Sequence, residues 1–190
     1  MEQELFIGQQ ECTTDEKRRF SIPPKFRPHL DQERTPSGFI YHMVVIPWYG
    51  GALAVLPVSR WREIQARILH MEYTTQEFLE AKRRCLPRME FTHTDPEGRL
   101  GLDPKHHAWI RLSPKGKDRV VVAGVGQHLE VWNATEWPEV ERTGKNMATR
   151  GAEEIEYDKQ LEILMQAARE AELSGRKPTP PEPPAAEETG

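Results

Sequence analysis

The chain has 190 residues but only two cysteines, Cys12 and Cys85, which lie far apart and form no Cys-x-x-Cys motif. This scarcity argues against a disulfide framework and against a zinc site built on cysteine. Long apolar runs are missing too, because the most apolar stretch, residues 43–58, is interrupted by prolines and glycines and is too broken to span a bilayer. The polar start, residues 1–4, is unlike a signal peptide. The sequence therefore predicts a soluble cytoplasmic protein without a membrane partner.

An excess of positive charge is also missing, since the formal net charge at pH 7 is −4. The charge is unevenly distributed, because residues 151–190 hold ten acidic and four basic residues and therefore carry −6. Residues 1–150 carry the remaining +2. An acidic tail thus accompanies a mildly basic body, and a body of this kind is compatible with a nucleic-acid partner.

Patterns typical of catalysis or metal binding do not stand out. We find no nucleophile–base set and no phosphate-cradling loop, so we predict no enzyme, no cofactor and no small-molecule substrate. His93, His106 and His107 lack carboxylate or thiol partners at the spacing of a tetrahedral metal site, and adjacent histidines point apart. We interpret these histidines as surface or core side chains.

What the chain does contain is a repeat. Residues 15–25 align with residues 95–105 at an offset of 80, sharing Asp-x-x-x-Arg, two apolar positions spaced by one, a proline and a lysine. A second block follows in the same order, because residues 53–61 align with residues 129–137 at an offset of 76. This period is far longer than that of a solenoid repeat. We infer two half-domains that pack on each other, since a lone half would bury too little surface.

Each copy of the first block, around residues 15–25 and 95–105, has the pattern of a strand, a turn and a second strand. Asp95-Pro96-Glu97-Gly98 has the residue order of a type I turn. The first copy carries Arg18 in place of Gly98, so its turn is either less strained or differently built. Residues 25–30 are predicted to form a short helix after two prolines. The β-branched runs bounded by glycine predict two hairpins, residues 43–46 with 53–56 and residues 119–122 with 129–132.

Helices are predicted between the copies and after the second copy. The first begins at residue 58 or 59 and presents Trp61, Ile64, Ile68 and Met71 on one face. The second begins with a capping box at Thr74-x-x-Glu77 and is closed by Pro87. A third amphipathic helix covers residues 155–168 and is ended by Ser174-Gly175.

Two segments of the repeated blocks, residues 15–27 and 120–132, make the chain resemble the MraZ family of the swapped-hairpin AbrB superfamily. The resemblance covers residues 1–142. It implies an α+β fold of two tandem AbrB-like swapped-hairpin β units in a pseudo-two-fold arrangement with flanking helices. It also implies a nucleoid-associated, DNA-binding transcriptional regulator of the bacterial division and cell-wall gene cluster. Such a protein binds direct repeats in the promoter as a ring-shaped homo-oligomer, with no cofactor and no catalysis.

The sequence departs from the family pattern at several positions. Arg18 replaces the usual glycine, Asp103 replaces the usual proline, and Glu97 stands where the first copy has Lys17. Two of these changes add acids to the second copy, so the second copy is the weaker candidate for contact with DNA.

The repeat and the resemblance divide the chain into four predicted segments. Residues 1–72 form a first AbrB-like half with its following helix, and residues 73–142 form a linking helix with the second half. Residues 143–176 form a helical C-terminal extension. Residues 177–190 form a disordered tail rich in proline and glutamate.

The predicted DNA-binding side chains are basic residues of the repeated blocks, namely Lys17, Arg18, Arg19, Lys25, Arg27, Arg99 and Lys105. Asp15, Asp95 and Gly98 are predicted to shape the turns. Arg19 and Arg99 have two possible roles: contact with DNA, as the family motif implies, or an ion pair with the aspartate four residues earlier. The cluster around Lys17 favours phosphate contacts, because basic residues at turns and helix starts position proteins on the DNA backbone.

Two questions stay open at this point. The chain could instead be an AbrB-like protein-interaction or scaffold module without DNA binding, and salt-dependent DNA binding by residues 1–142 would distinguish the two functions. The acidic segment after residue 142 could compete with DNA for the basic body, or its amphipathic helix could dock on that body.

Overall fold

The computed structural model describes residues 6–70, 75–144 and 151–173. The strands are β1 (Phe6–Thr13), β2 (Arg19–Ser21), β3 (Asp31–Thr35), β4 (Gly38–Pro47), β5 (Leu53–Pro57), β6 (Glu90–His93), β7 (Arg99–Gly101), β8 (Arg119–Gly126) and β9 (Leu129–Asn133). The helices are η1 (Pro24–His29), η2 (Tyr49–Gly51), α1 (Val58–His70), α2 (Gln76–Cys85), η3 (Leu86–Arg88), α3 (Pro104–Trp109), α4 (Trp137–Thr143) and α5 (Ala152–Leu173). This combination of antiparallel strands and helices confirms the predicted α+β class.

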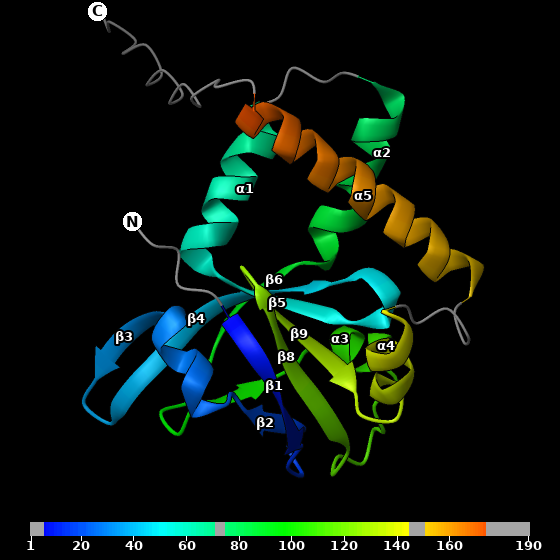
Figure 1. Ribbon diagram of the computed structural model, residues 1–190. Coiled ribbons are helices and arrows are strands. Elements are labelled where there is room, and N and C mark those ends of the chain that lie inside the picture. The colour runs from blue at the N-terminus through cyan, green and yellow to red at the C-terminus, as the bar shows by residue number, and fades with distance from the viewer. Residues whose placement is uncertain (1–5, 71–74, 145–150, 174–190) are drawn as a thin grey trace, which may run out of the picture.

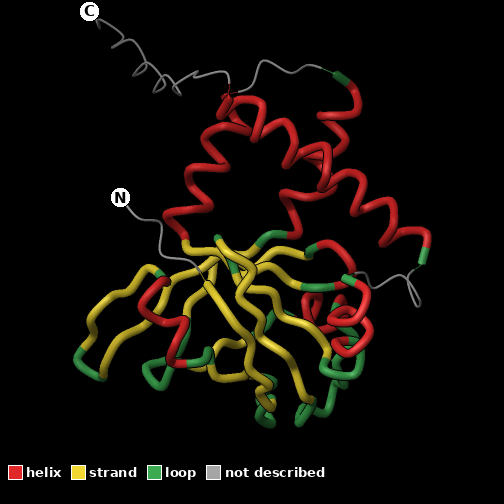
Figure 2. Tube along the Cα trace, in the orientation of Figure 1, coloured by secondary structure: helices red, strands yellow, loops and turns green. Residues whose placement is uncertain are grey.

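Within these residues the strands form a seven-stranded antiparallel sheet in the order β1-β8-β9-β5-β4-β3, with β6 also paired to β4. A separate small sheet consists of β2 and β7. Helices α1, α2 and α5 lie together on one side of the strands, whereas the turn that joins β1 to β2 lies at the opposite end of the molecule (Figures 1 and 2). The molecule therefore has a helical layer and, away from it, a group of turns.

The two copies of the sequence repeat meet each other in register. Phe20 of β2 pairs with Leu100 of β7, and these two residues hold the same position in the repeat. Ala54 of β5 likewise pairs with its counterpart Glu130 of β9. The exchange is reciprocal, since β1 pairs with β8 of the other half and β6 pairs with β4. The halves are thus interleaved and share one sheet.

The core lies on both faces of the large sheet because its central strands alternate. Met43 and Val45 of β4 are buried among the residues of a cluster that includes Phe20 and Leu100 of the small sheet. We call this the turn-side cluster. Val44 and Ile46 point the other way, into a cluster formed with α1, α2 and α5. We call this the helix-side cluster. Both faces of β4 are therefore buried from Met43 to Pro47.

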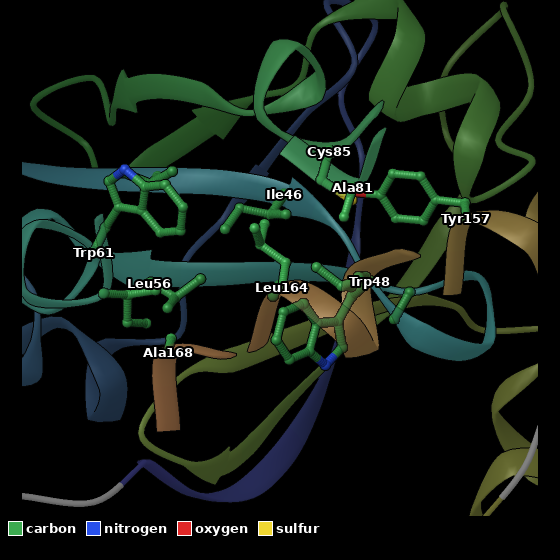
Figure 3. Packing of buried hydrophobic residues seen from close by; sticks show 14 of the residues in the cluster. Ile46, Trp48, Leu56, Trp61, Ala81, Cys85, Tyr157, Leu164 and Ala168 are labelled. Atoms are coloured by element: carbon green, nitrogen blue, oxygen red, sulfur yellow. The ribbon is translucent and has the colours of Figure 1, made fainter. Parts of the chain in front are cut away.

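Helix α5 is an integral part of the helix-side cluster. Tyr157, Leu161 and Leu164 are fully buried in it, and the Tyr157 hydroxyl donates a hydrogen bond to the Pro47 carbonyl oxygen at 3.2 Å. In the close-up of this cluster, Leu164 lies with Ile46 among the buried side chains (Figure 3). The amphipathic helix predicted for residues 155–168 thus docks on the body of the same chain.

Local details differ from the sequence-based predictions. Thr75 is the N-cap of α2, where its hydroxyl accepts a hydrogen bond from the Phe78 backbone N–H at 3.3 Å, so the capping box placed at Thr74 is wrong. Strand β8 continues through Gly126, beyond the run of residues 119–122 predicted from the sequence. Thr74 itself, the predicted Ser174-Gly175 stop and the predicted disordered tail lie outside the described residues. No described helix is long and apolar enough to cross a membrane.

Candidate functional site

The two Asp-x-x-x-Arg motifs form turns of the same construction, which we call the first turn (residues 15–18) and the second turn (residues 95–98). In the first turn, Arg18 N–H donates to the Asp15 carbonyl oxygen at 2.9 Å, and Asp15 N–H donates to the Arg19 carbonyl oxygen at 2.7 Å. The Asp15 carboxylate accepts a third bond from Arg19 N–H at 2.9 Å. The equivalent bonds of the second turn measure 2.9, 2.9 and 2.8 Å. Asp15 and its counterpart Asp95 therefore hold both turns from within.

Arg18 adopts a backbone conformation that normally favours glycine. Its φ is +61°, close to the +79° of Gly98 at the equivalent position. The first turn is therefore neither less strained nor differently built, and both alternatives drawn from the sequence are wrong. A left-handed conformation costs a residue with a side chain roughly 1 kcal/mol, and such strain is often kept where a side chain has a function.

Arg19 and Arg99 each make an ion pair with the aspartate four residues earlier, which is the second of the two roles predicted from the sequence. Arg19 Nε lies 2.9 Å from Asp15 Oδ2, and Arg19 Nη1 lies 2.9 Å from Asp95 Oδ2, so Arg19 connects the two turns. Arg99 Nε lies 2.7 Å from Asp95 Oδ2, and its Nη2 lies 2.9 Å from Glu97 Oε2. Both guanidinium groups are partly exposed and are engaged by carboxylates.

The carboxylates of this network are held in their charged form. Hydrogen bonds from the Arg19 backbone and guanidinium lower the pKa of Asp15. Partial burial raises the pKa of Asp95, but hydrogen bonds from Arg99 and the charges of Arg99 and Arg19 outweigh that effect, so the pKa is lowered overall. The ion pairs that join the turns are therefore fully formed at neutral pH.

Lys25 and Arg27, two further predicted DNA contacts, are directed onto the protein itself. Lys25 Nζ donates to the Gln9 carbonyl oxygen at 2.9 Å, on edge strand β1. Arg27 Nε donates to the Ile22 carbonyl oxygen at 2.8 Å. The Arg27 guanidinium also fills the space beside Gly98, where a Cβ would come within 2.4 Å of Arg27 Cζ. A side chain at Gly98 would therefore have to displace this flexible guanidinium group.

Lys17, Arg18 and Lys105 are the remaining predicted DNA contacts. Lys17 and Lys105 are exposed, Arg18 is half-buried, and within the described part of the chain no carboxylate pairs with any of these side chains. Asp103 uses its carboxylate to cap α3, accepting a hydrogen bond from Lys105 N–H at 2.8 Å. Glu97, at the position of Lys17, adds a negative charge to the second turn. The two turns have the same backbone conformation but differ in charge.

The sequence analysis missed the loop of residues 113–118, which lies against the first turn. Thr14 N–H donates to the Asp118 carbonyl oxygen at 2.8 Å, and Asp118 N–H donates to the Thr14 hydroxyl at 3.0 Å. Lys117 Nζ lies 3.2 Å from Glu16 Oε1. The Lys-Gly-Lys triplet at residues 115–117 was the available signal. Its neighbour is about 100 positions away in the sequence, so the spacing does not reveal the contact.

The histidines and cysteines do not form a reactive site. His106 is buried, its Nε2 lies 2.8 Å from the Arg88 carbonyl oxygen, and burial lowers its pKa against the opposing effect of Glu90. Burial raises the pKa of Cys12 and raises that of Cys85 to about 11, so neither is an activated thiolate at neutral pH. Among the described residues, no group of three or more His, Cys, Asp or Glu side chains could hold a metal ion.

Comparisons with known proteins agree with the resemblance found in the sequence. Residues 5–84 match the family described as "MraZ protein, putative antitoxin-like". The "Transcriptional regulator MraZ" of Herpetosiphon aurantiacus is 28% identical over 136 residues, which cover 72% of this chain and 86% of that protein. The proteins of the same name from Pediococcus pentosaceus and Mycobacterium leprae are 28% and 26% identical, covering 75% and 79% of this chain and 91% and 96% of their own lengths. The chain is therefore a homologue of the MraZ proteins.

Proposed function

We propose that this protein is a DNA-binding transcriptional regulator that binds direct repeats in the promoter of the bacterial division and cell-wall gene cluster. The observation that carries the proposal is the name shared by its relatives, "Transcriptional regulator MraZ", over 72–79% of this chain. In this proposal the protein acts in the cytoplasm at the nucleoid.

The first turn is the proposed main contact with DNA. Its Lys17 and Arg18 side chains have no carboxylate partner in the described part of the chain, so they are available to phosphate oxygens. Arg19 holds this turn in place through its ion pairs with Asp15 and Asp95. Arg99 and Lys105 contribute less, since Glu97 pairs with Arg99. Lys25 and Arg27 hold neighbouring backbone in place through their hydrogen bonds to the Gln9 and Ile22 carbonyl oxygens.

The pairing of equivalent residues supports the proposed architecture of two AbrB-like swapped-hairpin units. Phe20 faces its counterpart Leu100, and Ala54 faces its counterpart Glu130. A two-fold axis relating the halves would pass through both pairs. The reciprocal pairing of β1 with β8 and of β6 with β4 is what an exchange of strands between two such units produces.

Assembly into a ring-shaped homo-oligomer is the second part of the proposal. The outer strands of the sheet carry apolar side chains in solvent, since Ile7 of β1 is 73% exposed and Phe91 of β6 is 58% exposed. Exposed strand edges of this kind favour association with another chain. A ring would place several first turns along repeated DNA sites, so that weak contacts sum through effective concentration.

The proposal is tested by titrating the full chain with the duplex from upstream of its own gene and with a scrambled duplex of equal length. Affinity should fall steeply between about 50 and 200 mM salt, because phosphate contacts release counterions. Tighter binding to the upstream duplex is expected, together with light scattering from an oligomer. If an intact oligomer binds neither duplex in a salt-dependent way, the protein-interaction or scaffold module becomes the better description.

A further inference from the structure

We propose that the loop of residues 113–118 is a second arm of the DNA-binding surface, in which Lys115 and Lys117 contact phosphates next to those bound by the first turn. This inference rests on the proposed function and adds a segment outside the Asp-x-x-x-Arg repeat to its site. It also fixes the side of the first turn along which the duplex would run.

The loop is fixed to the first turn by close backbone contact. Gly116 has a φ of +73°, and a Cβ at this position would lie 2.6 Å from the Asp15 carbonyl oxygen, so only glycine permits this approach. Two hydrogen bonds join Thr14 to Asp118, and the Asp118 carboxylate closes the loop by accepting a bond from Ser113 N–H at 3.0 Å. Lys115 and Lys117, on either side of Gly116, are therefore held beside the first turn.

Backbone strain marks Lys117 as a residue kept for its side chain. Among the described residues, the non-glycine residues with positive φ are Arg18 at +61°, Arg111 at +53° and Lys117 at +64°. Arg111 has a structural task, because it binds Glu136 and Glu154 at 3.1 and 2.9 Å. Arg18 and Lys117 lie on the two sides of the contact between turn and loop, and glycine would fit either position with less strain. A charge at both positions is consistent with a binding task.

The charges of the surface are available to a polyanion. Lys117 pairs with Glu16, but their side chains are 71% and 81% exposed, and such pairs are weak enough for a phosphate to replace the carboxylate. Lys115 is exposed, and no carboxylate contacts its side chain in the described part of the chain. The other acids nearby are occupied, Asp15 by Arg19 and Asp118 by the loop backbone. Turn and loop together thus present four cations, Lys17, Arg18, Lys115 and Lys117.

The second turn lacks such an arm. The turn between β3 and β4 lies near it, since a Cβ on Gly38, the first residue of β4, would lie 3.5 Å from the Pro96 carbonyl oxygen, an ordinary van der Waals distance. Residues 35–38 contain neither lysine nor arginine. Of these two neighbouring segments, only the loop beside the first turn therefore carries lysines, next to the turn that also has Lys17 and Arg18.

The test compares three full-length chains: the unmodified protein, Lys115→Ala combined with Lys117→Gly, and a charge-matched control, Arg83→Ala combined with Lys159→Ala. Arg83 and Lys159 are exposed residues of α2 and α5, in the helical layer. Binding of the upstream duplex is measured by fluorescence anisotropy at several salt concentrations, and melting temperature is measured alongside. The loop variant should bind about tenfold or more weakly, and its log–log salt slope should fall by about 2, since each phosphate contact contributes about 0.9. Its melting temperature should not fall.

Each other outcome overturns the inference in a distinguishable way. If the unmodified protein shows no salt-dependent binding, the proposed function fails and the inference fails with it. If the unmodified protein binds and the loop variant matches it in affinity and slope, the inference alone fails. An equal loss in the control variant would assign the effect to net charge, and the loop would have no specific role.

Discussion

Single side chains in and around the first turn divide into those that hold it and those that are free to bind. The Arg19 guanidinium is held by the Asp15 and Asp95 carboxylates, whereas Lys17 and Arg18 have no carboxylate partner in the described part of the chain. Hydrogen bonds to the backbone are the reason that aspartate is suited to both turns. The motif arginines are thus better described as positioning residues than as the cations most exposed to a ligand.

The first residue-scale prediction concerns Arg19 and Arg99. Arg19→Ala should lower the urea midpoint more than Arg99→Ala, because Arg19 connects both turns while Arg99 bonds within its own. Arg19→Ala should also weaken DNA binding more, since it loosens the turn that carries Lys17. Urea denaturation followed by fluorescence and a DNA titration check the two parts. Equal midpoints and equal affinities for the two variants would contradict the asymmetry.

The second residue-scale prediction separates stability from binding at Arg18. Arg18→Gly should stabilise the fold by up to about 1 kcal/mol, because glycine removes the steric cost of the left-handed conformation while adding some entropy to the unfolded chain. The same change should weaken DNA binding by removing a cation. Opposite signs for the two effects are the expected result. A variant that is less stable than the parent, or that binds DNA equally well, would refute this account of Arg18.

At the scale of elements, the repeat predicted more than the local patterns did. The offset of 80 residues placed both turns correctly, and runs such as residues 119–122 indicated real strands. The pairing of β1 with β8 could not be read from spacing, because strand order depends on packing between distant segments. The helix boundary at Thr75 was missed since two threonines in succession can both cap a helix. The loop contact with the first turn was missed for the same reason as the strand order.

Helix α5 changes how the C-terminal segment should be tested. Removing everything after residue 142 would remove an acidic segment and would also uncover the helix-side cluster, so charge and packing would change together. Leu164→Ala tests the packing alone and should destabilise the fold by about 2–5 kcal/mol, as for other buried leucines. Gln166→Ala, at an exposed position of the same helix, is the matched control and should have little effect. Similar thermal denaturation of the two variants would show that α5 is not docked.

At the scale of the whole molecule, the titrating groups predict how stability depends on pH. The folded-state pKa of His106 is lowered by burial, so its contribution is complete above the unfolded value of about 6.5 and is lost as pH falls through the folded value. The pKa values of Asp15 and Asp95 are lowered too, so their contributions are lost only below about pH 4. The urea midpoint should therefore be steady near neutral pH and should decline in two stages as the pH is lowered.

His106→Gln is the variant that checks the first stage. It should reduce the decline that begins below about pH 6.5, although His107, whose pKa is also lowered by burial, should leave part of it. The decline below about pH 4 should be unchanged, because the aspartates of the turns are untouched. An unchanged first stage in this variant would mean that His106 does not couple folding to protonation.

The first and second turns have the same backbone hydrogen bonds but different charges. Exchanging those charges is the most direct test of DNA binding by the first turn. Lys17→Glu combined with Arg18→Gly gives the first turn the Glu97-Gly98 chemistry of the second, which the fold already accommodates. Glu97→Lys is the control with a charge change of the opposite sign in the second turn. DNA affinity and its salt slope should be measured for both variants against the parent. The exchange should weaken binding strongly and lower the salt slope by about 2 or more, while light scattering and melting temperature stay at the parental values, and Glu97→Lys should not weaken binding. Binding by the exchanged variant with parental affinity and slope would contradict the claim that the first turn is the DNA-binding surface.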